Sequence, residues 1–245
     1  MKLMADAPLF YQSIVPLDRE RHRKLRLVQN QRPFAFAAKS HMIPAVVDEF
    51  AMASRFLPIV FLPSSPHPSP VFLVGARTGQ NLYVDKDGKW AEGYVPAFVR
   101  RYPFMLGTPE NGSPIICVDE KHEGLRQNGA GDRLFSEEGA ETPVLQEFAK
   151  LTESYYAAAK RTEAFLETIN ALQLLRGVTI EMRPEPGSSN ALHGFMTIDE
   201  TRLNALSDQD FLRLRAEGWL AHIYAHLFSL GVIDRLRRLS APAHA

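Results

Sequence analysis

Apolar residues form short runs in the first part of the chain and recur at helical spacing in the second part. Short apolar runs bounded by Pro, Gly, Asn or Asp predict strands. Such runs cover residues 25–28, 34–38, 59–62, 71–76, 81–85 and 115–119. Residues 43–56 instead place apolar side chains on one face of a helix. Because the strands follow one another with few helices between them, we expect a largely antiparallel sheet.

The second part begins with a long helical pattern. Thr142 supplies an N-cap hydroxyl and Pro143 suits the first helical position. Apolar or small residues then recur with heptad spacing as far as Leu172, and Gly177 is predicted to end the helix. At 1.5 Å per residue this helix would be about 50 Å long. We expect it to pack antiparallel to the last helix; a protruding end, a bend or contact with a partner chain are the alternatives.

The predicted fold class is α+β, with a largely antiparallel sheet in the first half and long helices in the second half. After the long helix we expect a strand pair and a short helix, over residues 178–182, 192–198 and 200–206. Ser207 then caps a single final helix, which ends near a group of arginines. Residues 1–140 form the mixed α+β region, and residues 141–245 form a mainly helical region that packs on it as one continuous domain.

Composition narrows the classes of function. Lys plus Arg and Asp plus Glu each number 28, so the formal net charge is zero. The chain therefore lacks the overall positive field of a nucleic-acid-binding protein. The one cysteine, Cys117, lies in an apolar run and is expected to be a buried small hydrophobe. The N-terminal residues lack the apolar run of a secretory signal, and no segment has the length of a membrane span. We expect a cytoplasmic protein without membrane insertion.

Motifs of the common catalytic and cofactor sites are absent. The sequence contains no phosphate-binding GxxxxGK[ST] loop, no GxSxG nucleophile elbow, no HExxH and no CxxC. Gly129 and Gly131 lack the third glycine and the preceding strand of a dinucleotide fingerprint. We therefore expect no cofactor and no catalytic residue.

Residues 81–104 carry the densest group of aromatic and cationic side chains. Asp87 and Gly88 predict a tight turn, after which Trp90 begins a return strand. Aromatic and arginine side chains are enriched where interfaces bind most tightly. The predicted binding surface consists of Trp90, Tyr94, Phe98, Arg100, Arg101 and Tyr102.

The adjacent arginines Arg100 and Arg101 are the most specific chemical feature of this segment. Neighbouring residues on a helix point about 100° apart, so at most one of them faces inward. A guanidinium pairs with carboxylates and stacks on aromatic rings. We expect one of them to form a structural ion pair with a buried acid such as Asp85 or Asp87, and capture of a ligand carboxylate is the alternative.

A second group of candidate residues lies on the last predicted helix. His222 and His226 are four residues apart and share a helix face, as two metal ligands could. No acidic residue lies between them, and Trp219 and Ile223 make that face apolar. We expect core or interface histidines, with a metal pair as the alternative.

Five sequence blocks in order resemble the bacterial SapC family. They are VPLDRERHRKLRL at 15–27, NLYVDKDGKW at 81–90, VPAFVRRYPF at 95–104, FMTIDETRLNAL at 195–206 and IYAHLFSLG at 223–231. The resemblance implies a role related to the surface layer, and it assigns no catalytic residues. Arg100, Arg101, Tyr102 and His226 match the family's pattern, whereas His222 stands where that pattern has an apolar residue.

These observations lead to one expected function and two alternatives. We expect a non-catalytic accessory protein that binds a peptide or protein in a surface-layer or envelope-related pathway. The first alternative is an enzyme that modifies an amino acid or peptide, with assistance from a metal at His226. The second alternative is an assembly protein that forms a homodimer through the helix from Thr142 to Leu175.

Overall fold

Five antiparallel strands form the largest sheet, in the order β10-β11-β4-β5-β3. The computed structural model describes residues 8–28, 30–91, 93–109, 112–182 and 190–240. The strands are β3 (Met42–Pro44), β4 (Ile59–Leu62), β5 (Ser69–Leu73), β10 (Leu175–Met182) and β11 (Asn190–Ile198). Ile59, Val60 and Phe61 of β4 are all fully buried, which explains why this strand is continuously apolar rather than alternating.

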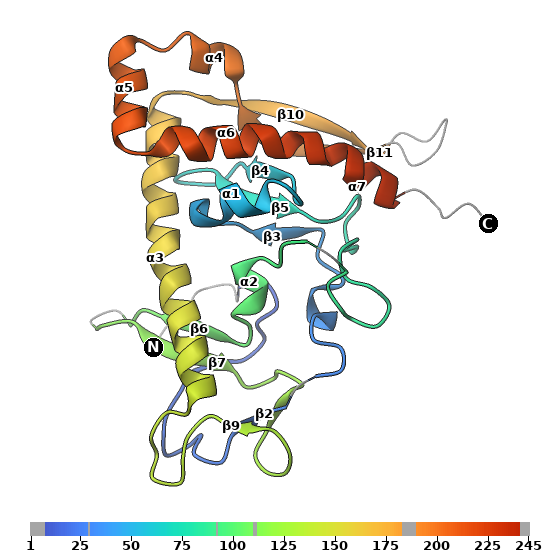
Figure 1. Ribbon diagram of the computed structural model, residues 1–245, viewed down its shortest axis with the longest axis vertical. Coiled ribbons are helices and arrows are strands. Elements are labelled where there is room, and N and C mark those ends of the chain that lie inside the picture. The colour runs from blue at the N-terminus through green and yellow to red at the C-terminus, as the bar shows by residue number, and fades with distance from the viewer. Residues whose placement is uncertain (1–7, 29, 92, 110–111, 183–189, 241–245) are drawn as a thin grey trace, which may run out of the picture.

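Two smaller antiparallel sheets lie in the other half of the elongated molecule (Figure 1). Their strands are β1 (Ile14–Pro16), β7 (Ile115–Asp119) and β6 (Phe104–Gly107), and β8 (Leu125–Arg126), β2 (Arg26–Leu27) and β9 (Asp132–Arg133). The glycine-containing segment 124–139 contributes the two short strands β8 and β9. The predicted strand at 115–119 is confirmed.

Helices dominate the second half, as predicted. They are α1 (Phe50–Ala53), α2 (Ala97–Arg100), α3 (Pro143–Ala171), α4 (Glu200–Asn204), α5 (Asp208–Ala216), α6 (Trp219–Ser229) and α7 (Ile233–Ser240), with 3-10 turns η1 (Ala35–Ala37), η2 (Val47–Glu49) and η3 (Leu230–Val232). The α+β class, with antiparallel sheet in the first half and long helices in the second, is confirmed. The main apolar core contains side chains from Tyr11 to Leu236 and so draws on both predicted regions.

Several predicted elements of the first half are wrong. Residues 34–38 form η1 rather than a strand. The helix predicted over 43–56 is split into β3, η2 and α1, because Pro44 cannot lie within a helix and residues 42–44 pair with β5. Residues 81–85 form no strand, and a single bridge joins Val84 to Trp90. The predicted turn is present, since the amide of Asp85 donates to the carbonyl of Lys89 at 2.9 Å.

The long helix and the final helix also differ from their predictions. α3 ends at Ala171, where Gln173 adopts a positive φ of 53°, and Gly177 lies within β10 instead of ending the helix. Gly218, with a φ of 80°, separates α5 from α6, because a left-handed residue cannot continue a helix. α6 crosses the end of α3 instead of running antiparallel to it (Figure 1).

Candidate functional site

α2 is a single helical turn that places Arg100 and Arg101 in different environments. Arg101 is buried, whereas the side chain of Arg100 is 43% exposed. The prediction that at most one of them faces inward is confirmed. In Figure 1, α2 lies between the five-stranded sheet and the strands β6 and β7, close to α3.

The buried acid beside this turn is Glu49, not Asp85 or Asp87. Its Oε1 accepts hydrogen bonds from the amide of Ala97 at 2.6 Å and from the hydroxyl of Tyr94 at 2.8 Å. Arg100 Nη2 lies 4.0 Å from the same oxygen. Burial raises the pKa of Glu49, and its Oε2 is buried without a hydrogen-bond partner among the described residues. Glu49 therefore fixes the start of α2 and the orientation of Tyr94.

The carboxylate of Asp85 has a local role instead. It accepts hydrogen bonds from the amides of Asp87 and Lys89, both at 2.9 Å. These two bonds stabilise the turn locally, so this Asp85 oxygen pairs with backbone amides of its own turn. The expected pairing of an arginine of α2 with this turn is wrong, because folding places Glu49, which is distant in the sequence, beside Arg100 instead.

Arg101 lies among aromatic rings. Its guanidinium carbon is 4.4 Å from the ring centroid of Tyr155, 4.6 Å from that of Phe98 and 5.6 Å from that of Tyr11. Its Nε is buried and has no hydrogen-bond partner in the described part of the chain. We call Arg101 and these three rings the Arg101 cage.

Tyr102 connects this region to a buried carboxylate. Its hydroxyl donates to Asp119 Oδ2 at 3.1 Å, and burial raises the pKa of Tyr102 so that the hydroxyl stays protonated. Asp119 also accepts the amides of Gln12, Ser13 and Lys121 at 2.8 to 3.1 Å. Tyr102 is thus a structural anchor between α2 and the end of β7.

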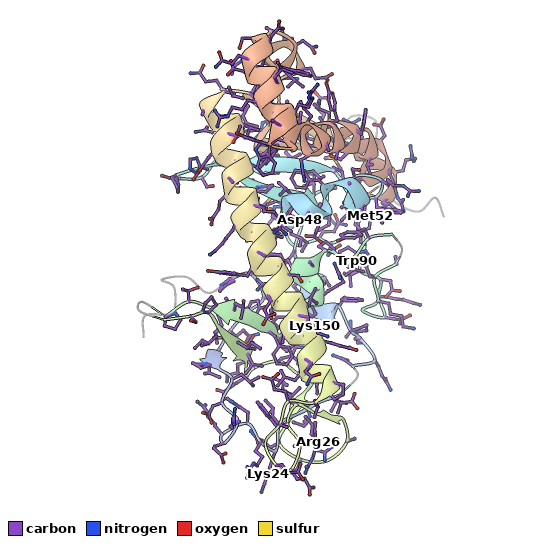
Figure 2. The ribbon with its side chains drawn as sticks, turned by 60° about the vertical axis from the view of Figure 1, so that its left-hand side comes forward. Lys24, Arg26, Asp48, Met52, Trp90 and Lys150 are labelled. Atoms are coloured by element: carbon purple, nitrogen blue, oxygen red, sulfur yellow. The ribbon has the colours of Figure 1, made fainter. Side chains whose placement is uncertain are left out.

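The six candidate residues do not share one exposed surface. Trp90 stacks on Tyr83 with a centroid distance of 5.8 Å, and its indole Nε1 is buried. Phe98, Arg101 and Tyr102 are buried, and Tyr94 is half-buried. Figure 2 places Trp90 apart from α3, on the opposite side of α2. Only Arg100 of this set is well exposed.

The two histidines of the predicted pair have separate environments. His226 is fully buried, and its Nε2 accepts the amide of Ile198 at 3.1 Å and lies 2.9 Å from Thr197 Oγ1. His222 is partly exposed and packs near Trp219 and Phe50. The described residues contain no group of three His, Cys, Asp or Glu side chains suited to a metal ion. The Nε2 atom of His226 is therefore already used in holding α6 to β11.

His226 gives the stability of the fold a specific pH dependence. Burial lowers its pKa to about 4, whereas an unfolded histidine takes up its proton near 6.5. Its stabilising contribution is complete above pH 6.5 and is lost as pH falls from 6.5 to about 4, because only the unfolded state binds the proton in that window. The loss is about 3 kcal/mol.

Urea denaturation at pH 7 and pH 4.5 tests this expectation. The drop in the free energy of unfolding should be smaller in His226→Gln than in the wild type, since glutamine does not titrate. Equal drops in both proteins would show that His226 is not responsible.

The described residues also form an open hollow of about 810 Å³ beside the Asp85–Lys89 turn. Its lining residues are Asn30, Gln31, Arg32, Pro33, Lys86, Asp87 and Lys89. None of the six candidates lines this hollow, so it is separate from the Arg101 cage.

Comparison with known proteins identifies the family. The SapC family model matches residues 17–236, which is most of the chain. The chain belongs to the SapC family. No curated protein and no solved structure matches it.

The six candidate residues and α6 lie within the matched part of this SapC chain, whereas Tyr11 of the Arg101 cage precedes it. The block at 95–104 forms α2 and the start of β6, and the block at 223–231 forms most of α6. In the described ranges, none of the helices combines the length and apolar character needed to cross a bilayer.

An exposed apolar face of the SapC chain was missed at the sequence level. Phe228 is 75% exposed and Tyr224 is 39% exposed on α6, where their rings stack at 6.3 Å. Met52 is 59% exposed on α1, which packs against α6. In Figure 2, Met52 is labelled beside α1, below α6 in that view. We call these three side chains the α1–α6 face.

A sequence signal for this face existed. Residues 219–229 are apolar almost all the way round the helix, on the side with Tyr224 and Phe228 as well as on the side with Ile223. A helix that is apolar on every side is normally covered on every side. The side with Ile223 and His226 packs inward, so the opposite side with Tyr224 and Phe228 is left uncovered.

Proposed function

We propose that this SapC protein is a non-catalytic accessory protein that binds another protein through the α1–α6 face, in a surface-layer or envelope-related pathway. The observation that carries the proposal is the exposure of Phe228, stacked on Tyr224 beside the helix that carries Met52. Aromatic side chains and Met are enriched in the buried centres of protein interfaces. Burying a side chain such as Phe228 contributes about 1.5–3 kcal/mol.

Charge favours a different protein over a second copy of this chain as the partner. α7 follows α6 after the short turn η3 and carries Arg235, Arg237 and Arg238, with Asp234 as its one acid. A symmetric dimer centred on Phe228 would bring two such basic helices together, which like charges oppose. A partner with an apolar patch bordered by acidic side chains fits this surface.

The side chains of α3 also argue against a homodimer. Its apolar side chains are used within the chain, since Phe148 packs on Phe104 and Phe165 packs on Phe50. Among the exposed large apolar side chains of the described residues, none lies on α3. A homodimer through α3 would therefore lack an apolar seam.

Site-specific crosslinking tests the proposed function. A photoreactive benzoylphenylalanine replaces Phe228 in the native bacterium, and mass spectrometry identifies the crosslinked chain. Leu212 on α5, which is 51% exposed, is the control position. We expect one acidic-surfaced protein to be crosslinked from position 228 and not from position 212. The purified partner should bind the wild type, and Tyr224→Ser with Phe228→Ser should weaken binding at least about tenfold.

Two results would overturn the proposal. One is a crosslink from position 228 only to a second copy of the chain, with a dimer in light scattering. The other is a purified partner that binds the double serine variant as tightly as the wild type.

A further inference from the structure

Arg101 is a buried cation that forms no ion pair with any described residue. Its side chain is only 6% exposed, and its Nε has no hydrogen-bond partner among those residues. The described residues provide neither a hydrogen bond nor an ion pair to the rest of its guanidinium. A guanidinium carries five N–H donors, and leaving the buried Nε donor unpaired is unfavourable.

The surrounding rings hold the cation but do not satisfy its donors. Tyr155, Phe98 and Tyr11 present their rings within 5.6 Å of the guanidinium carbon. Ring faces attract a cation through their quadrupole, yet they provide no directional acceptors in the guanidinium plane. The cage therefore fixes the orientation of the Arg101 guanidinium and leaves its N–H donors available to an acceptor from another molecule.

Tyr155 adds a second donor at the same place. Its hydroxyl makes no hydrogen bond to a described residue, and burial raises the pKa of Tyr155 to about 12, so it remains a donor. Tyr11 differs, because its hydroxyl already donates to the carbonyl of Phe104 at 2.7 Å. The unpaired donors thus come from Arg101 on α2 and Tyr155 on α3.

We propose that Arg101 and Tyr155 bind a singly charged carboxylate, from a small organic acid or from the C-terminus of a peptide. A carboxylate accepts two parallel N–H bonds from a guanidinium and has lone pairs left for a hydroxyl. This site is distinct from the α1–α6 face and does not depend on the proposed function.

The charges around the cage favour one negative charge over two. Burial is the main cause of the raised pKa of Tyr155 and of Tyr11, and the carboxylates of Glu49 and Asp119 respectively add to it, so both acids lie close enough to act on the cage. A phosphate dianion would meet stronger repulsion from these acids than a carboxylate would. We therefore expect the site to prefer a carboxylate to a phosphate dianion.

Binding measurements with defined probes test this site. The probes are acetate, benzoate, trialanine with a free C-terminus, amidated trialanine and inorganic phosphate. We expect at least one carboxylate to raise the melting temperature of the wild type and to bind in calorimetry, while amidated trialanine does not. Binding of acetate or benzoate indicates a small acid, and binding of trialanine alone indicates a peptide end.

Substitutions then assign the binding to the cage. Arg101→Met should weaken carboxylate binding roughly 10- to 100-fold, since charged hydrogen bonds are lost. Arg101→Lys keeps the positive charge but lacks the two parallel N–H donors of a guanidinium, and Tyr155→Phe removes only the hydroxyl. Both should weaken binding less than Arg101→Met while the protein stays folded. The control is Arg55→Met, at an exposed arginine that lies 5.8 Å from the ring centroid of Phe56. It should leave the affinity unchanged.

Three results would overturn the proposal. The first is a wild-type melting temperature that no carboxylate raises at about 50 mM, where even millimolar affinity would be visible. The second is equal carboxylate affinity in the wild type, Arg101→Lys and Tyr155→Phe. The third concerns Asp6, which lies outside the described residues. If Asp6→Asn lowers the melting temperature as much as Arg101→Met, the chain supplies its own carboxylate.

Discussion

Replacing Asp119 by alanine is expected to lower the free energy of unfolding by about 3–5 kcal/mol. The carboxylate is fully buried at the end of β7. It accepts three backbone amides and the hydroxyl of Tyr102, and alanine would leave all four donors without an acceptor. Two of those amides, from Gln12 and Ser13, belong to the segment that enters β1, so that segment should detach first.

Thermal and urea denaturation measure this effect. For a chain of this size we expect the melting temperature to fall by roughly 10 °C. The matched control is Glu120→Gln at the next residue, whose exposed ion pair with Arg21 contributes at most about 1 kcal/mol. A loss below about 1 kcal/mol in Asp119→Ala would mean that water replaces the lost acceptor.

Phe165→Ala is expected to cost about 3–5 kcal/mol, because it opens a cavity where several elements meet. The ring of Phe165 is fully buried on α3. It packs against Trp219 of α6 at 5.6 Å and against Phe50 of α1 at 6.1 Å. The substitution therefore weakens the packing of α3 against both α6 and α1, and not only one contact.

Two readouts distinguish this effect from a general loss of stability. Urea denaturation gives the free energy, and tryptophan emission should shift to longer wavelength as water reaches Trp219. Glu163→Ala, at an exposed position on the same helix, should stay within about 0.5 kcal/mol of the wild type. An unshifted emission together with a full loss of stability would show that α6 keeps its packing without Phe165.

The sequence was sufficient where local chemistry decides structure. Residues 59–62 and 115–119 are strands as predicted, because each is a short apolar run between residues that disfavour continued structure. Ser207 caps α5 as predicted, since its side chain accepts the amide of Asp210. The prediction failed at 34–38 and at 43–56, where apolar residues fit a strand or a helix equally well and the contacts of the folded chain selected the outcome.

The candidate site shows the same division. That Arg100 and Arg101 would diverge follows from helix geometry alone. Helix geometry does not predict which acid lies beside α2, because Glu49 and Ala97 are 48 residues apart in the chain. Likewise, a heptad pattern identifies the buried side of α3 but does not reveal that this side packs on the chain's own sheets rather than on a partner.

By itself, the sequence determined the class of the fold, its antiparallel sheet, its long helix and its resemblance to the SapC family. Periodicity and capping are local properties, so they can be read along the chain. Only the tertiary structure decided that Phe98, Arg101 and Tyr102 are buried and that Phe228 is exposed. Burial depends on which distant segments cover a side chain. For that reason most side chains of the segment predicted as a binding surface are buried, and exposed aromatic side chains lie on α6 instead.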